Sequence, residues 1–181
     1  GRVSDRASIF TQEENAQLTA LLENIEMQRS QTQIAILTLE NLGGFDIKTV
    51  ALKVAEKWKL GKKGTDNGLL ILISMKERQL RIETGNGLEG ILPDSYLGTL
   101  AREKVQPLLK EGKNFEAFNT LLLTLDEKIA QEFNSQHKKS SKPQSEEETS
   151  WGTVLFWVIA LIVIVIASIF GYGPAGTIGG I

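Results

Sequence analysis

The C-terminal end of this chain carries no charged side chain after Glu148, although the whole chain has 20 basic and 22 acidic residues. Within it, residues 154–170 (VLFWVIALIVIVIASIF) are apolar except for one serine. A membrane-spanning helix needs about 20 mostly apolar residues, and Trp151 and Trp157 are placed as interfacial aromatics are. We therefore predict a transmembrane helix over 151–170. The alternative, a buried core helix, fits poorly with a terminal run that shows no amphipathic pattern.

The composition around this run divides the rest of the chain. Residues 135–150 (SQHKKSSKPQSEEETS) are polar and mixed in charge, which is typical of a solvated linker. Residues 171–181 are rich in glycine and are expected to form a flexible tail. Residues 1–134 remain for one globular domain, a usual size for a single domain.

The orientation of the predicted span is read from nearby charges. Lys138, Lys139 and Lys142 lie close to it, and by the positive-inside rule they favour a cytoplasmic globular domain. The chain begins with Gly1, so a signal peptide removed before that residue would leave no trace in this sequence.

Composition also excludes several kinds of chemistry. The chain has no cysteine, which rules out disulfides, thiolate catalysis and cysteine-ligated metal sites. Its one histidine, His137, lies in the expected linker and is not a candidate ligand. The formal net charge of −2 does not imply a nucleic-acid partner.

The spacing of apolar residues predicts seven elements in the domain, in the order helix, strand, helix, strand, strand, helix, helix. The expected elements are helices after Thr11 and Asp46, strands over 33–39, 69–74 and 80–84, a helix from Asp94 that Pro107 ends, and a last helix near Asn114. The strands are too apolar to have one wet face. We therefore predict an α/β fold, a three-layer sandwich with a short mixed sheet covered by helices.

Two polar, glycine-rich loops flank the predicted hairpin of the last two strands. Residues 61–68 precede it and residues 85–94 follow it. Antiparallel pairing places both loops at the same end of the sheet. Residues 85–90 match G-x-G-x-x-G, but in a dinucleotide site the glycines open a helix directly. Here Pro93 intervenes, so nucleotide binding is not expected.

The same loops carry oxygen ligands. Asp66, Glu89 and Asp94 supply carboxylates and Asn67 supplies an amide oxygen, the donors that Ca²⁺ and Mg²⁺ prefer. Their spacing matches no EF-hand. Asp-Asn-Gly is also common turn chemistry, and an aspartate after proline is a common helix cap. A metal site and a purely structural role both stay open on spacing alone.

The loop segments resemble the TPM domain family. The resemblance covers roughly residues 3–134 and is most specific over 61–94. It is carried by VSD at 3–5, QIAI at 33–36, WKLG at 58–61, DNGLLIL at 66–72, RIETGNGLEG at 81–90 and LPD at 92–94.

The resemblance implies a three-layer α/β domain outside the cytoplasm, with an acidic cleft that binds divalent cations. It assigns Asp66, Glu89 and Asp94 to that cleft, and Asp5 also matches a family position. Plant relatives have been assigned acid phosphatase activity and a place in photosystem II repair, and an animal relative assists a neurotransmitter receptor. The family therefore shares a fold more than a function.

The apolar run predicts a single-pass membrane protein. For its orientation we follow the family resemblance over the positive-inside rule, because a removed signal peptide would fix the orientation, and we expect a periplasmic or otherwise extracytoplasmic domain. We expect it to bind Ca²⁺ or Mg²⁺ through Asp66, Asn67, Glu89 and Asp94, and to serve as a binding or assembly module for a membrane protein complex. The expected partners are the lipid bilayer and that complex, with no nucleic acid and no nucleotide. The alternative is a metal-dependent acid phosphatase, in which Lys62 or Lys63 would lie near the phosphate.

Overall fold

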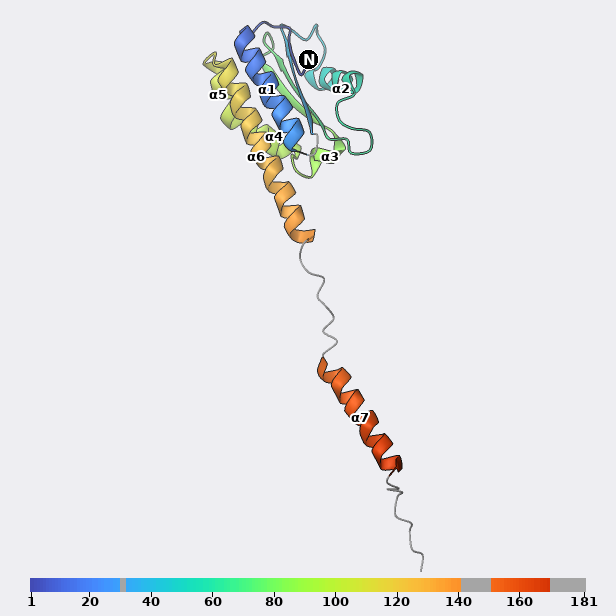
Figure 1. The fold of residues 1–181 in the computed structure, drawn as a ribbon. Coiled ribbons are helices and arrows are strands. Elements are labelled where there is room, and N and C mark those ends of the chain that lie inside the picture. Colours follow the sequence, from blue (N-terminus) through green and yellow to red (C-terminus); the bar gives the residue numbers. More distant parts are fainter. Residues whose placement is uncertain (30–31, 141–150, 170–181) are drawn as a thin grey trace, which may run out of the picture. The chain divides into compact units, whose positions relative to one another are not determined.

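The computed structural model describes residues 1–29, 32–140 and 151–169. The chain forms two units, Gly1–His137 and Lys138–Ile181. In chain order the elements are β1 (Val3–Asp5), α1 (Gln12–Gln28), β2 (Gln33–Leu39), α2 (Ile47–Trp58), β3 (Gly68–Ser74), β4 (Gln79–Thr84), α3 (Asn86–Glu89), α4 (Asp94–Leu100), the π-helical turn η1 (Ala101–Val105), α5 (Gln106–Lys110), α6 (Asn114–Ser140) and α7 (Trp151–Ile169) (Figure 1).

The sheet has four strands in the order β1-β2-β3-β4. Strands β1, β2 and β3 are parallel, and β4 pairs with β3 in antiparallel fashion. This confirms the predicted α/β fold with a short mixed sheet. Strand β1 was missed from the sequence because three residues are too few for an alternating pattern to show.

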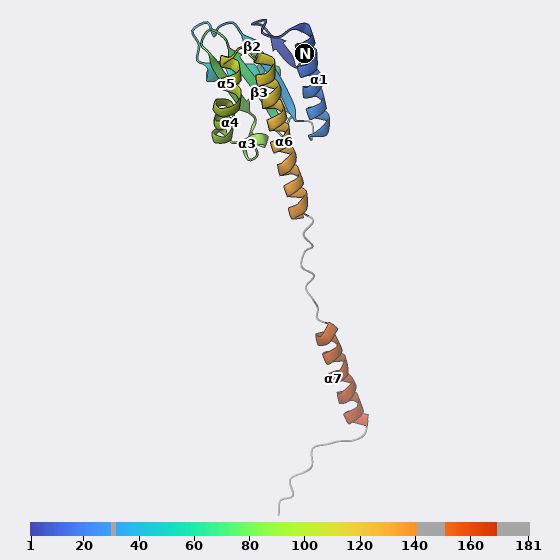
Figure 2. The ribbon, with the colours of Figure 1, turned by 90° about the vertical axis from the view of Figure 1, so that its left-hand side faces the viewer.

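Helices cover both faces of the sheet (Figures 1 and 2). One set of strand residues packs with α1, α3, α4 and α6 in the larger core, which includes Leu18, Leu22, Ile36, Ile71, Leu88, Leu97, Phe118 and Leu121. The alternate set packs beneath α2 in a smaller core of Ala35, Leu37, Ala51, Leu70 and Leu72. Because β3 is buried on both faces, its sequence is continuously apolar instead of alternating.

Two predicted helix starts are confirmed. The Thr11 hydroxyl accepts a hydrogen bond from the Glu14 N–H, and the Glu14 carboxylate accepts one from the Thr11 N–H, which is a capping box. The Asp46 carboxylate accepts a hydrogen bond from the Thr49 N–H at the start of α2.

The prediction that Pro107 ends a helix is wrong. Helix α4 continues through η1 into α5, and Pro107 is the second residue of α5. Proline lacks an N–H, and its ring clashes with the carbonyl four residues earlier. The π-helical turn widens the chain just before it, with the Gln106 N–H donating to the Ala101 carbonyl five residues back. The helix therefore absorbs the proline instead of ending.

The C-terminal part bears on the predicted linker, span and tail. Helix α6 runs to Ser140, so the expected linker over 135–150 begins inside it, and residues 141–150 and 170–181 lie outside the described part. The described residues hold no helix that is both long enough and apolar enough to cross a membrane. The transmembrane helix predicted over 151–170 is therefore not found as such, and α7 occupies Trp151–Ile169.

Candidate functional site

The two glycine-rich loops meet at one end of the sheet. In the β3–β4 pair, Leu69 is in register with Thr84, so the first loop enters the sheet where the second loop leaves it. The Gly85 N–H donates to the Gly68 carbonyl at 2.8 Å, and the Gly87 N–H donates to the Asp66 carbonyl at 3.2 Å. The predicted convergence of the loops is confirmed, and main-chain hydrogen bonds hold it together.

Glycine is required on the second loop because the two backbones approach so closely. A Cβ atom on Gly85 would lie 2.1 Å from the Asp66 carbonyl oxygen, and one on Gly87 would lie 1.8 Å from the Thr65 carbonyl oxygen. No side chain fits at these distances. The G-x-G-x-x-G pattern here therefore serves loop-to-loop packing.

The structure corrects one premise of the argument against nucleotide binding. A short helix, α3, does open directly after Gly85, at Asn86. The Gly87 N–H, which would face a phosphate in a dinucleotide site, is bonded to the Asp66 carbonyl, and the absence of nucleotide binding stays a prediction.

Asn67 has a structural role in the first loop. It is 8% exposed, and its side-chain oxygen accepts hydrogen bonds from the Lys62 N–H at 2.9 Å and from the Thr65 hydroxyl at 3.0 Å. These bonds shape the turn between α2 and β3. The side-chain oxygen is committed to the loop, which is the turn chemistry that the sequence left as an alternative.

Asp66 is exposed and lies beside a pocket of about 470 Å³ between α2 and the converging loops. Its backbone is left-handed, with φ of +44°. Glu56, Glu83 and Lys59 also line this pocket. The two glutamates were missed from the sequence: Glu56 reads as part of a solvated helix face, and Glu83 reads as an ordinary alternating strand residue.

Glu89 and Asp94 do not line that pocket. Glu89 is the exposed last residue of α3. Asp94 was predicted to cap α4, but it is the first residue of the helix and makes no capping hydrogen bond, since Pro93 holds the cap position. Its carboxylate is 72% exposed and lies 3.7 Å from the Arg81 guanidinium.

Arg81 links the edge strand to α4. Its guanidinium lies 2.7 Å from a carboxylate oxygen of Glu83 and 3.7 Å from one of Asp94. A cation already stands between these two carboxylates, which lowers their joint attraction for a metal ion.

The described residues contain no group of three acidic or histidine side chains placed to hold a metal ion together. The loops bring their backbones into contact without gathering Asp66, Glu89 and Asp94 into one cluster. Of the four predicted ligands, Asp66, Glu89 and Asp94 have exposed carboxylates that are not grouped, and the Asn67 side-chain oxygen is used within its own loop.

Asp5 lies at the opposite end of the sheet. It is in register with Thr38 on β2, whereas Gly68, next to Asp66, is in register with Gln33. Five residues of strand separate the two positions, roughly 17 Å at ~3.3 Å per residue. The Asp5 carboxylate accepts hydrogen bonds from the main-chain N–H groups of residues 9 and 10 and from the Thr38 hydroxyl. Its role here is to hold the turn after β1.

A model of the TPM domain matches residues 3–128, and the chain belongs to this family. A comparison with curated proteins gave no match. Among solved structures, the N-terminal domain of a protein from P. gingivalis aligns with a TM-score of 0.65 and 28% identity, over 70% of this chain and 80% of that one.

Two further solved structures share the fold. The BA42 protein of the psychrophilic bacterium Bizionia argentinensis aligns with a TM-score of 0.59 and 20% identity, over 67% of this chain and 82% of its own. The N-terminal domain of the cg2496 protein of Corynebacterium glutamicum gives 0.54 and 18%, over 81% and 83%. At these identities the likeness concerns the fold alone.

Proposed function

We propose that this TPM domain is a binding module whose contact surface is the end of the sheet where residues 59–67 and 85–94 converge. The observation that carries the proposal is the direct hydrogen bonding of the two loops, from Gly85 to Gly68 and from Gly87 to Asp66. Binding residues are commonly found on loops that a rigid scaffold positions. Here two loops far apart in sequence act as one preorganised surface.

We propose further that the surface binds Ca²⁺ or Mg²⁺, with Asp66 as the main ligand and Glu89 and Asp94 as the other carboxylates. The support is the exposure of all three side chains on the converging loops. Asn67 contributes by shaping the turn, since its side-chain oxygen is already used. Because these carboxylates are not grouped in the described geometry, a weak site completed by water is the form we expect.

The cation proposal is tested on the full chain by thermal unfolding with and without CaCl₂ or MgCl₂. An ion that binds only the folded state raises the midpoint as its concentration increases. Asp66→Asn should abolish the increase and leave the fold intact, because asparagine tolerates the left-handed backbone at this position. Glu103→Gln, an exposed change on η1, is the matched control and should respond as the wild type does.

We also propose that residues 151–170 attach the domain to a lipid bilayer, with the domain on the extracytoplasmic side. The support on α7 is the exposure of apolar side chains such as Leu155, Phe156, Trp157 and Ile162. We expect the chain to resist alkaline extraction from membranes. We also expect protease added to intact spheroplasts to digest the domain. Release of the chain by alkali would contradict the membrane attachment, and protection of the domain from the protease would contradict the extracytoplasmic orientation.

Acid phosphatase activity remains the alternative function. It is tested by phosphomonoester hydrolysis with Mg²⁺, Mn²⁺ or Ca²⁺, in wild type and in Asp66→Asn. Turnover that the substitution abolishes would replace the binding module with an enzyme. Thermal stabilisation by the ion without turnover is the result that the binding module predicts.

A further inference from the structure

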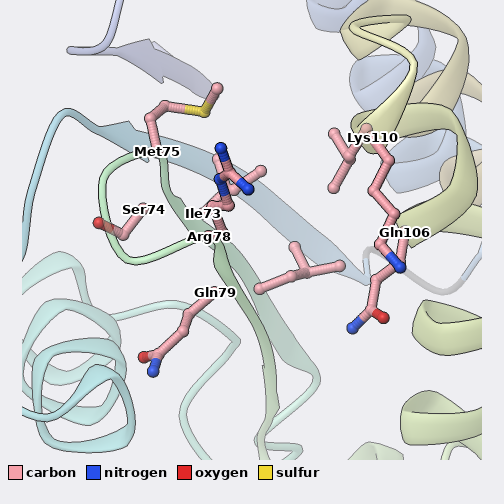
Figure 3. Close-up of a pocket in the computed structure, with 9 residues that line it drawn as sticks. Ile73, Ser74, Met75, Arg78, Gln79, Gln106 and Lys110 are labelled. Atoms are coloured by element: carbon pink, nitrogen blue, oxygen red, sulfur yellow. The ribbon is translucent and has the colours of Figure 1, made fainter.

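A second pocket, separate from the two-loop end, lies beside the turn of the β3–β4 hairpin. Its volume is about 490 Å³, within the usual range for small-molecule sites. It is bounded by the end of β3, the hairpin turn and α5 (Figure 3). The pocket therefore adjoins the carboxyl end of a central parallel strand, where α/β sheets commonly bind ligands.

The pocket has an apolar side formed by Ile73, Leu80 and Leu109. Ile73 and Leu80 are directly paired across β3 and β4, so their side chains share one face of the hairpin. The pair Ser74 and Gln79 comes next in the register and faces the other way. This side of the pocket can pack against a hydrocarbon chain or ring.

Both charged residues that line the pocket, Arg78 and Lys110, are cationic. Arg78 comes from the hairpin, and Gln106 and Lys110 come from α5, so the two cations approach the pocket from different elements (Figure 3). Within the described residues, neither Arg78 nor Lys110 takes part in an ion pair.

Glu77, the acidic residue next to Arg78 in the sequence, is hydrogen-bonded to other groups. The Glu77 carboxylate accepts hydrogen bonds from the Ser74 hydroxyl and from the Leu42 N–H. These bonds tie the hairpin turn to the loop after β2. The turn also holds Arg78 in the left-handed region, with φ of +53°. The arginine is thus presented by an anchored turn, and Glu77 forms no ion pair with it.

We propose that this pocket binds a small organic acid. The carboxylate would lie between Arg78 and Lys110, and an apolar ring or short chain would pack on Leu80 and Leu109. A guanidinium matches a carboxylate through two parallel hydrogen bonds, and a lysine adds a further charge. The apolar side supplies burial energy that a bare inorganic anion could not use.

The test is an NMR titration of the full chain with phenylacetate, read at individual backbone amides. Saturable shifts are expected in residues 75–80 and 106–110. Phenylacetamide, which lacks the charge, and acetate, which lacks the ring, should each bind at least about tenfold more weakly. Equal binding of phenylacetate and phenylacetamide would overturn the proposal, as would shifts confined to α7.

Variants separate this site from nonspecific attraction. Arg78→Gln combined with Lys110→Gln should weaken phenylacetate binding at least about tenfold, since two charged partners are removed. Lys48→Gln combined with Lys57→Gln removes the same charge from exposed positions on α2 and should change binding less than about twofold. Wild-type affinity in the first variant would overturn the proposal. The result is independent of cation binding, because the two sites lie at opposite ends of β3.

Discussion

The main-chain oxygen of Asp66 accepts a hydrogen bond from the main-chain N–H of Gly87 at 3.2 Å, joining loops that are 21 positions apart in the sequence. This bond and its neighbour from Gly85 to Gly68 make the two-loop end a single unit. Asp66 depends on this bond for its position, because its own main-chain oxygen is the acceptor.

Gly87→Ala should destabilise the domain by about 1–3 kcal/mol, the usual cost of overpacking. The added Cβ would lie 1.8 Å from the Thr65 carbonyl oxygen, so the loops must separate. Urea unfolding followed by circular dichroism measures the change.

Gly98→Ala is the matched control for that substitution. Gly98 lies inside α4, and a Cβ there meets nothing within 4 Å. Alanine favours a helix interior over glycine, so this variant should be more stable than the wild type by roughly 0.5–1 kcal/mol. Equal effects of the two substitutions would contradict the packing role assigned to Gly87.

Asn67→Ala should cost about 1–3 kcal/mol, because it removes the acceptor for the Lys62 N–H and the Thr65 hydroxyl. Asn67→Asp keeps an acceptor oxygen and should cost less. The comparison is made by thermal unfolding of the three proteins. If alanine were tolerated as well as aspartate, the carboxamide oxygen would not be what shapes the first loop.

Ser74→Ala should raise the pKa of Glu77 toward its ordinary value of 4.5. In the wild type the Ser74 hydroxyl is the largest cause that lowers this pKa, and the Leu42 N–H adds to it. A lowered carboxyl pKa contributes stability that is present above pH 4.5 and is lost as pH falls through the folded-state value. Titration of the Glu77 side-chain carbon signal by NMR in both proteins tests this, and identical curves would refute it.

Much of the fold was predictable from the sequence, because apolar spacing and capping residues mark most elements. Thr11 with Glu14 marked the start of α1, and the run in β3 marked a doubly buried strand. Pro107 misled the prediction, because a π-helical turn can accommodate a proline that would break a regular helix.

The candidate site was predictable only at the level of loops. Two neighbouring strands joined by a short turn pair in antiparallel fashion, so the convergence of the loops could be inferred from residues alone. Side-chain directions could not. Asn67 turned inward to satisfy its own loop, Asp94 came beside Arg81, and Asp5 lay at the other end of the sheet. The Arg78–Lys110 pocket was missed because it joins a turn and a helix that no sequence pattern connects.

The central claim is that the two loops form one cation-binding surface, and an NMR titration of the full chain with CaCl₂ or MgCl₂ tests it most directly. The claim predicts saturable amide shifts in residues 62–67 and in residues 85–94. Both sets should reach half of their full shift at the same cation concentration, about 1 mM, as in weak extracellular calcium sites. The Asp66→Asn variant should show neither set of shifts. Shifts in one loop alone, or none that saturate, would contradict the claim.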